Sequence, residues 1–198
     1  PEAEYITTIL NKVIGIMGKS YDRYIFVEIL QENKLPEKDV CLYIVNQIKK
    51  YYWKYNSEKT PYFAYGSNMS RQQMKERCPD AKFIQRDILE DYVFEINTRG
   101  VATIIPKKGS LVEGVLWELS PSCIESLDRY EGVANGTYKK DLLLFSNTIN
   151  KEALVYIASD MEAGKPRDQY LEKIIESAKI EGLSEKYIDF LEKLLFDR

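Results

Sequence analysis

The sequence contains no histidine among its 198 residues, and this absence removes several classes of active site. Ser-His-Asp hydrolases, Cys-His enzymes and His-ligated metal centres all require an imidazole. The glycine patterns G-x-x-x-x-G-K-[ST] and G-x-G-x-x-G, which cradle phosphates, are also missing. Proton transfer would therefore fall to a carboxylate, lysine, tyrosine or cysteine side chain, and we expect neither a metal nor a cofactor.

Cysteine is scarce, and long apolar runs are lacking. Cys41, Cys78 and Cys123 are odd in number, widely spaced and without a C-x-x-C pair, so they predict reduced thiols rather than a zinc site. No run of 18 apolar residues occurs, and the N-terminus does not have the pattern of a signal peptide. We therefore expect a cytoplasmic protein with no membrane partner.

Neither sign of charge dominates the sequence. The 28 basic and 31 acidic residues give a net charge of -3, which provides no general attraction for nucleic-acid phosphates. We therefore expect no nucleic-acid partner. With 44% hydrophobic residues, the composition is that of a globular protein with room for one domain and an appendage.

The first 60 residues have the pattern of a helical segment. Apolar residues recur at helical spacing to about Tyr55, so we predict a helical N-terminal extension over residues 1–60 and a second domain over residues 61–198. The stretch QIKKYYWKY mixes lysines with aromatics, and this leaves DNA binding as an alternative role. The other interpretation is that the extension packs on the following domain or on a second copy in a homodimer, and its intermixed acidic residues favour this one.

Beyond Pro61 the pattern changes to short β-favouring runs that alternate with helices. The predicted strands cover residues 62–66, 91–97, 101–106, 111–119, 141–146 and 152–158. The predicted helices cover residues 70–78, 120–132, 168–178 and 184–196, and Ser120 is the expected N-cap of the second. This mixture predicts an α+β fold whose strands form a sheet or a barrel.

The first candidate site is the turn in YFAYGSNM, residues 62–69. Gly66 permits unusual backbone angles and a close approach to a ligand. Successive backbone N–H groups after a strand form a positive concavity that suits an anion or a carbonyl group. The alternative is that Ser67 and Asn68 only cap the helix that follows.

The second candidate site is Glu131 in LDRYEGVANGTY, residues 127–138. This glutamate follows a predicted helix and precedes Gly132, so it stands at a helix-to-loop junction. A carboxylate held beside Tyr130 and other apolar groups has a raised pKa and can act as acid and base in turn. The alternative is an ordinary solvent-exposed glutamate on the surface.

Four blocks together resemble the γ-glutamylcyclotransferase family, also described as AIG2-like. In chain order they are YFAYGSNM, GVATIIPKKGSLVEGVLWEL, ESLDRYEGVANGTYKK and PRDQYLEKIIESAKIEGLSEKYIDFLEKL, and they cover residues 62–196. The resemblance implies a small twisted β-barrel with flanking helices, in which the loop and a glutamate face one cavity. Residues 1–60 have no counterpart in it.

The resemblance also implies roles for six residues. It implies that Glu131 is the catalytic residue and that the other five bind substrate: Tyr65, Gly66, Ser67, Asn68 and Tyr170. The implied small-molecule partner is a γ-glutamyl compound, whose free α-amino group attacks its own side-chain carbonyl and releases 5-oxoproline and an amine. Because the nucleophile belongs to the substrate, one carboxylate suffices for both proton transfers.

Two questions stay open at this stage. The leaving amine could be an α-amino acid, a peptide, a lysine-like or polyamine amine, or part of an acylated natural product. The alternative function is a non-catalytic domain of the same fold that only holds a small metabolite.

Overall fold

The structure is a computed structural model that describes residues 59–196, except 146–148 and 150. These residues belong to one compact unit, Glu58–Arg198. The predicted helical extension over residues 1–60 lies outside the described residues except for its last two positions, as does Cys41. The extension and its boundary with the domain over residues 61–198 therefore stay predictions.

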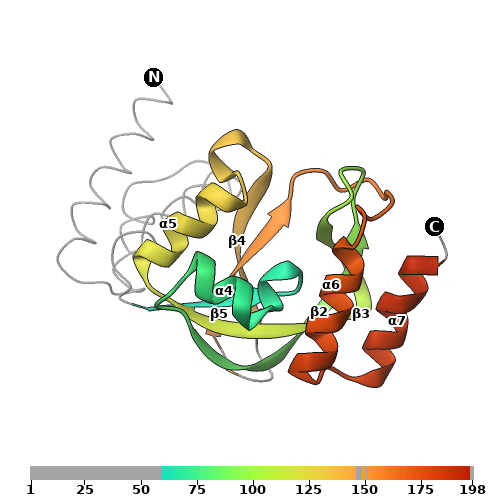
Figure 1. Cartoon of the computed structure of the whole chain (residues 1–198), viewed down its shortest axis with the longest axis horizontal. Coiled ribbons are helices and arrows are strands. Elements are labelled where there is room, and N and C mark those ends of the chain that lie inside the picture. Colours follow the sequence, from blue (N-terminus) through green and yellow to red (C-terminus); the bar gives the residue numbers. More distant parts are fainter. Residues whose placement is uncertain (1–58, 146–148, 150, 197–198) are drawn as a thin grey trace, which may run out of the picture. The chain divides into compact units, whose positions relative to one another are not determined.

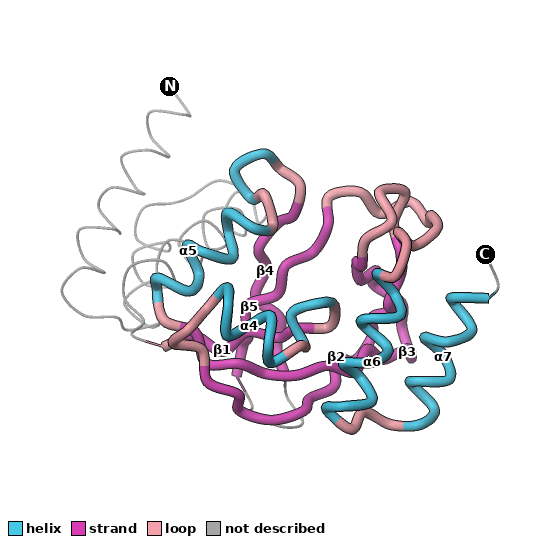
Figure 2. Tube along the Cα trace, in the orientation of Figure 1, coloured by secondary structure: helices cyan, strands magenta, loops and turns pink. Residues whose placement is uncertain are grey.

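Five strands form one sheet in the order β2-β3-β1-β5-β4 (Figure 2). The middle strand, β1, runs antiparallel to β3 and parallel to β5. A strand with neighbours on both sides and both faces covered is apolar without alternation, which explains the YFA run in β1. The strand bounds are β1 (Thr60–Ala64), β2 (Lys82–Ile96), β3 (Ala102–Leu119), β4 (Tyr138–Phe145) and β5 (Lys151–Ala158).

Helices and short 3₁₀ turns connect these strands. Helices α6 and α7 run side by side, and Lys179 on α6 pairs with Glu192 on α7 at 2.6 Å (Figure 1). The combination of one sheet with separate helices confirms the predicted α+β fold. The helix bounds are α4 (Arg71–Arg77), α5 (Pro121–Tyr130), α6 (Tyr170–Glu181) and α7 (Glu185–Phe196), and the 3₁₀ turns are η1 (Ser67–Met69) and η2 (Val133–Asn135).

Both helix starts that bear on the site follow ordinary capping rules. Ser120 caps α5 as predicted. At the start of α4, the hydroxyl of Ser70 accepts a hydrogen bond from the backbone N–H of Gln73 at 3.3 Å. The alternative that Ser67 and Asn68 cap this helix is therefore wrong, because Ser70 has that role and the two residues belong to η1.

The hairpin of β2 and β3 is longer than the predicted strands 91–97, 101–106 and 111–119. Its register shifts between Glu90 and Tyr92, where Asp91 has a φ of 62° and accepts a hydrogen bond from the N–H of Gly109 at 2.8 Å. Gly109 itself has a φ of 77°. This irregularity bends one continuous hairpin at the Lys-Gly cluster, where the sequence indicated a break between two strands.

The described hydrophobic core consists of side chains from the sheet and from α4 to α7. Cys78 and Cys123 are buried in this core as free thiols, as expected from their spacing. None of the described helices is long and apolar enough to cross a membrane. The largest fully buried side chains include Phe63, Phe94, Met69, Leu116, Leu171 and Ile174.

Candidate active site

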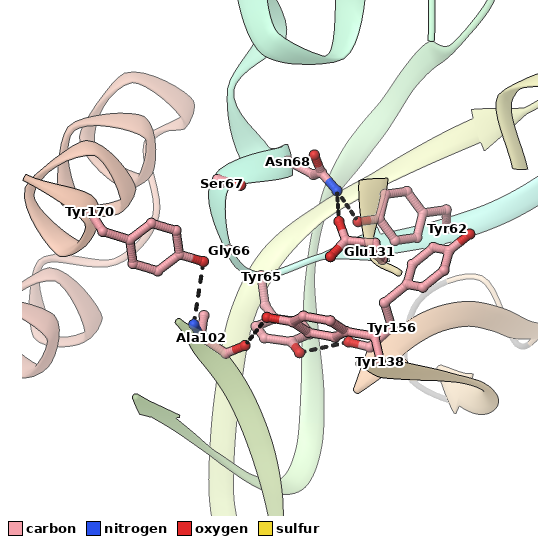
Figure 3. A pocket seen from close by; sticks show the side chains of 10 residues that line it. All are labelled: Tyr62, Tyr65, Gly66, Ser67, Asn68, Ala102, Glu131, Tyr138, Tyr156 and Tyr170. Atoms are coloured by element: carbon pink, nitrogen blue, oxygen red, sulfur yellow. Dashed lines mark hydrogen bonds between the residues drawn. The ribbon is translucent and has the colours of Figure 1, made fainter. Parts of the chain in front are cut away.

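One pocket contains all six residues that the sequence singled out (Figure 3). The end of β1 and the turn η1 contribute the loop residues, α6 contributes Tyr170 at its first position, and Glu131 follows the last residue of α5. Segments that are far apart in the sequence therefore meet at one place. The pocket is lined by Tyr62, Tyr65, Gly66, Ser67, Asn68, Ala102, Glu131, Tyr138, Tyr156 and Tyr170.

The end of α5 determines where Glu131 lies. Its backbone N–H makes a helical hydrogen bond to the carbonyl of Leu127 at 2.8 Å. The next residue, Gly132, has a φ of 64° in the left-handed region, which glycine adopts more easily than other residues and which ends the helix. The chain therefore turns away directly after Glu131, whose side chain points into the pocket (Figure 3).

The side-chain amide of Asn68 joins the loop to the glutamate. Its Nδ2 atom donates to Oε1 of Glu131 at 3.0 Å and to the hydroxyl of Tyr62 at 2.8 Å. Its Oδ1 atom accepts from Gln73 at 3.1 Å and from Nη1 of Arg77 at 2.8 Å. Because both ends of the amide are engaged, its donor end is fixed toward the carboxylate.

The pKa of Glu131 is raised above its ordinary value of about 4.5. Burial of the carboxyl is the main cause, and the charge of Arg77 and the hydrogen bond from Asn68 act against it. The side chain is half-buried and lies in the pocket, so it is not the solvent-exposed surface glutamate of the alternative interpretation. A carboxyl with a raised pKa is suited to accept a proton and to return it.

Gly66 has a φ of -116°, which lies outside the left-handed region. A methyl group at this position would be in ordinary contact with two neighbours and would fill the space beside them. A Cβ atom at residue 66 would lie 3.4 Å from the Cβ of Ala102 and 3.7 Å from the hydroxyl of Tyr170. A glycine therefore keeps the space between the loop and these two residues open.

Three consecutive backbone N–H groups in the loop are available to a ligand. Within the part of the chain that the structure describes, the N–H groups of Gly66, Ser67 and Asn68 have no hydrogen-bond acceptor. The N–H groups that follow, of Met69 and Ser70, donate to the carbonyls of Gly66 and Ser67. The three free donors suit a carboxylate or a developing oxyanion.

The tyrosines of the pocket differ in how their hydroxyl groups are used. Tyr65 donates to the carbonyl of Tyr156 at 2.6 Å, and Tyr138 donates to the carbonyl of Ala102 at 2.8 Å. Tyr170 instead accepts a hydrogen bond from the N–H of Ala102 at 3.3 Å, so its own proton is available to a ligand. Burial raises the pKa of Tyr65, Tyr138 and Tyr170, which keeps all three protonated.

Sequence reasoning missed four of the pocket residues, namely Tyr62, Ala102, Tyr138 and Tyr156. Tyr62 and Tyr138 stand only a few positions from predicted site residues, and an aromatic side chain so close to a candidate site was a usable signal. Ala102 and Tyr156 lie on β3 and β5, and only the pairing of the strands brings them to the site.

Known proteins resemble the chain over the same region. The AIG2-like family profile matches residues 111–191. The mouse (Mus musculus) protein Gamma-glutamylcyclotransferase is 32% identical over 145 residues, which are 67% of this chain and 77% of that protein. The human (Homo sapiens) protein of the same name is 30% identical over 151 residues, 70% of this chain and 80% of that protein.

A solved structure named Gamma-glutamyl cyclotransferase has a similar fold. It matches with a TM-score of 0.62 and 31% identity, over 68% of this chain and 87% of its own. The similarity in sequence and the similarity in fold agree with the four blocks found in the sequence. The chain belongs to the γ-glutamylcyclotransferase family.

Proposed function

We propose that this protein is a γ-glutamylcyclotransferase that converts a γ-glutamyl compound into 5-oxoproline and a free amine. Glu131 is the general base and the general acid of this reaction. The observation that carries the proposal is that Glu131 and the three loop residues whose N–H groups are free line one pocket and are linked by the hydrogen bond from Asn68.

The reaction begins with removal of a proton from the α-ammonium group of the substrate. Glu131 accepts this proton. Its raised pKa reduces the difference between the pKa of the carboxyl and the pKa of the ammonium, and this favours the transfer. The free amine then attacks the γ-carbonyl carbon and forms the new C–N bond of the lactam. The bond from that carbon to the leaving nitrogen breaks as Glu131 returns its proton to this nitrogen. The ring nitrogen then loses its second proton to the carboxylate of Glu131 as the lactam N–H forms, and this proton passes to the released amine, which leaves as an ammonium ion.

The loop and Tyr170 serve as the binding groups. The free N–H groups of Gly66, Ser67 and Asn68 hold the α-carboxylate of the glutamyl unit or the oxyanion that forms on the γ-carbonyl. The hydroxyl of Tyr170 supplies a further donor beside Gly66, on the side of the pocket away from Glu131 (Figure 3). Together these groups hold the substrate in the curled conformation that the attack requires.

Orientation accounts for much of the catalysis in this proposal, which is why an imidazole is unnecessary. The nucleophile and the carbonyl belong to one molecule, and correct alignment of such groups is worth about 7–11 kcal/mol of barrier. The protein has to supply the conformation, the donors and one proton carrier. Glu131 fits the last role without a second titrating group.

The electrostatics of Glu131 favour an enzyme over a domain that only binds a metabolite. Burial disfavours the charged form of this carboxyl, so its ionisation in the folded state is opposed. A binding domain has no need of such a group, and a neutral side chain would fill the position at lower cost. A proton carrier needs this raised pKa.

The test is release of 5-oxoproline from a panel of γ-glutamyl compounds, with the released amine identified by mass. Glu131→Gln should lower turnover by at least about a hundredfold, since a general acid–base contributes about 10² to 10⁴. Glu125→Gln changes an exposed glutamate of the same helix and is the matched control. Absence of 5-oxoproline with every compound, or normal turnover by Glu131→Gln, would contradict the proposal.

A further inference from the structure

A second and larger cavity lies directly beside the active-site pocket. This groove is lined by residues of α4 and α6, two helices that lie next to one another (Figure 1), and it shares Ser67 and Tyr170 with the pocket. It holds about 550 Å³ of space open to water, against about 30 Å³ in the pocket. The pocket is therefore small, and the groove continues from it between Ser67 and Tyr170.

The length of the groove follows from the helix that forms one wall. Its lining residues on α6 extend from Tyr170 to Glu181, which is eleven positions and about 16 Å at 1.5 Å per residue. Arg71 on α4 bonds to Glu181 through two hydrogen bonds of 2.8 and 2.9 Å and joins the two walls at that end. An extended peptide covers about 3.3–3.6 Å per residue, so roughly four residues fit along this wall.

Most of the residues that line the groove are polar or charged, and the carbon atoms of their side chains form about half of its surface. Apart from Tyr170 and Ile180, its side chains are serines, glutamines and charged residues. Such a surface offers hydrogen-bonding partners to the N–H and C=O groups of a peptide and carbon atoms to its side chains.

Some of these polar groups are already engaged. The charge of Arg71 is paired with Glu181, and Arg77 donates to Asn68. Among the described residues, the side chains of Gln72, Lys173 and Glu176 have no hydrogen-bond or ion-pair partner. These three side chains, from both walls, are free to contact a ligand.

We propose that this groove binds the leaving group of the substrate and that the leaving group is a short peptide of two or more residues. The proposal rests on the proposed function, because the leaving amine is the part of a γ-glutamyl compound that must extend beyond the pocket. The bond to be cleaved lies at the junction formed by Ser67 and Tyr170. A single amino acid as leaving group would leave most of the groove empty.

The experiment measures kcat/KM for γ-glutamylglycine and for the γ-glutamyl derivatives of diglycine and triglycine. We expect kcat/KM to rise by at least about fivefold from one glycine to three, because each added hydrogen bond contributes about two- to tenfold. The double variant Lys173→Ala/Glu176→Ala should reduce this ratio to less than about twofold. The control Lys75→Ala/Glu172→Ala removes one exposed charge of each sign from α4 and α6 at positions that do not line the groove, and it should keep the wild-type ratio.

The outcomes separate this proposal from the proposed function. If the wild type releases 5-oxoproline equally well from all three compounds, the groove proposal is wrong and the proposed function stands. If it releases none, the proposed function fails, and calorimetric binding of the same compounds to Glu131→Gln decides on the groove. The groove proposal is supported if the affinity of Glu131→Gln rises about fivefold from the glycine to the triglycine compound and this rise disappears when Lys173→Ala/Glu176→Ala is added to the same protein. Equal affinities for the three compounds, or no binding, would overturn it.

Discussion

Asn68 and Glu131 are 63 residues apart in the sequence, yet Nδ2 of the asparagine lies 3.0 Å from Oε1 of the glutamate. The asparagine comes from the loop after the central strand, and the glutamate comes from the end of α5. This hydrogen bond connects the group proposed to carry the proton with the loop proposed to hold the substrate. The position of one therefore depends on the other.

Asn68→Ala should lower kcat by about ten- to a hundredfold. The change removes a hydrogen bond to a charged group, which contributes about 1.5–3 kcal/mol, and 1.36 kcal/mol corresponds to tenfold. The backbone carbonyl of residue 68 still accepts from Nε1 of Trp117 at 3.1 Å, so the loop keeps an anchor. Steady-state kinetics with a melting curve on the same sample is the measurement, and an unchanged kcat in a folded variant would mean that this contact does not position Glu131.

The pH profile of kcat/KM should show the titration of Glu131. A general base works only when deprotonated, so activity should fall as the pH drops through the raised pKa of Glu131, above the ordinary value of about 4.5. The charge of Arg77 holds this pKa down. Arg77→Gln should therefore move the acidic limb of the profile to higher pH.

Arg77→Lys is the control for that shift. Lysine keeps the positive charge but loses the planar guanidinium that donates to Asn68 and lies 4.7 Å from the ring of Tyr130. The acidic limb of the Arg77→Lys profile should therefore lie at a pH closer to that of the wild type than the acidic limb of the Arg77→Gln profile does. If both variants shift equally, the charge of Arg77 is not what sets the pKa of Glu131.

The effect of Glu131→Gln on the free energy of unfolding should depend on pH. A carboxyl whose folded pKa is raised binds its proton more tightly in the folded state, so stability is lost as the pH rises from the unfolded pKa through the folded pKa. Glutamine does not titrate, and its carbonyl can still accept the hydrogen bond from Asn68. The melting temperature of Glu131→Gln minus that of the wild type should therefore grow from about pH 4.5 toward neutrality.

Melting curves at a series of pH values test this expectation. Glu125→Gln, on the exposed face of the same helix, is the matched control and should show no comparable trend. A difference between Glu131→Gln and the wild type that stays constant with pH would mean that burial does not raise the pKa of Glu131.

Rules that depend on neighbouring residues in the sequence predicted two parts of the site, the position of Glu131 and the loop after β1. Helix α5 ends at Tyr130, and the chain turns at Gly132 directly after Glu131, which follows from the helix pattern and the glycine together. The loop after β1 was recognisable from its glycine, serine and asparagine. Ala102 and Tyr156 were not predictable in this way, because strand pairing across the sheet brings them to the pocket.

The sequence predicted only the second part of β2, and the reason differs from the one that hid Ala102 and Tyr156. Residues 82–90 belong to β2, which lies at one edge of the sheet, and every second side chain in this segment, from residue 82 to residue 90, is exposed. This exposure permits the charged residues Lys82, Arg86 and Glu90 within the segment, and they weaken the pattern that identifies a buried strand. Similarly, Asp91 and Gly109 form an irregularity within one hairpin rather than a loop between strands.

Gly66→Ala should damage substrate binding more than folding. The φ of -116° lies outside the left-handed region and a methyl group would meet its neighbours only at ordinary contact distances, so we expect a change in stability of less than about 1 kcal/mol. The new methyl group would lie between the Cβ of Ala102 at 3.4 Å and the hydroxyl of Tyr170 at 3.7 Å. Because it occupies space beside the donor proposed to hold the substrate, KM should rise by about tenfold or more.

The double variant Gly66→Ala/Ala102→Gly distinguishes the two ways in which the methyl group can act. If the loss came only from crowding against Ala102, removing the Cβ of residue 102 would restore KM. We expect KM to stay high, because the methyl group would occupy the space beside the loop that we propose for the glutamyl unit. A normal KM in the single variant would place the substrate elsewhere in the pocket, away from Gly66 and Tyr170, and would leave the free N–H groups of the loop without their proposed ligand.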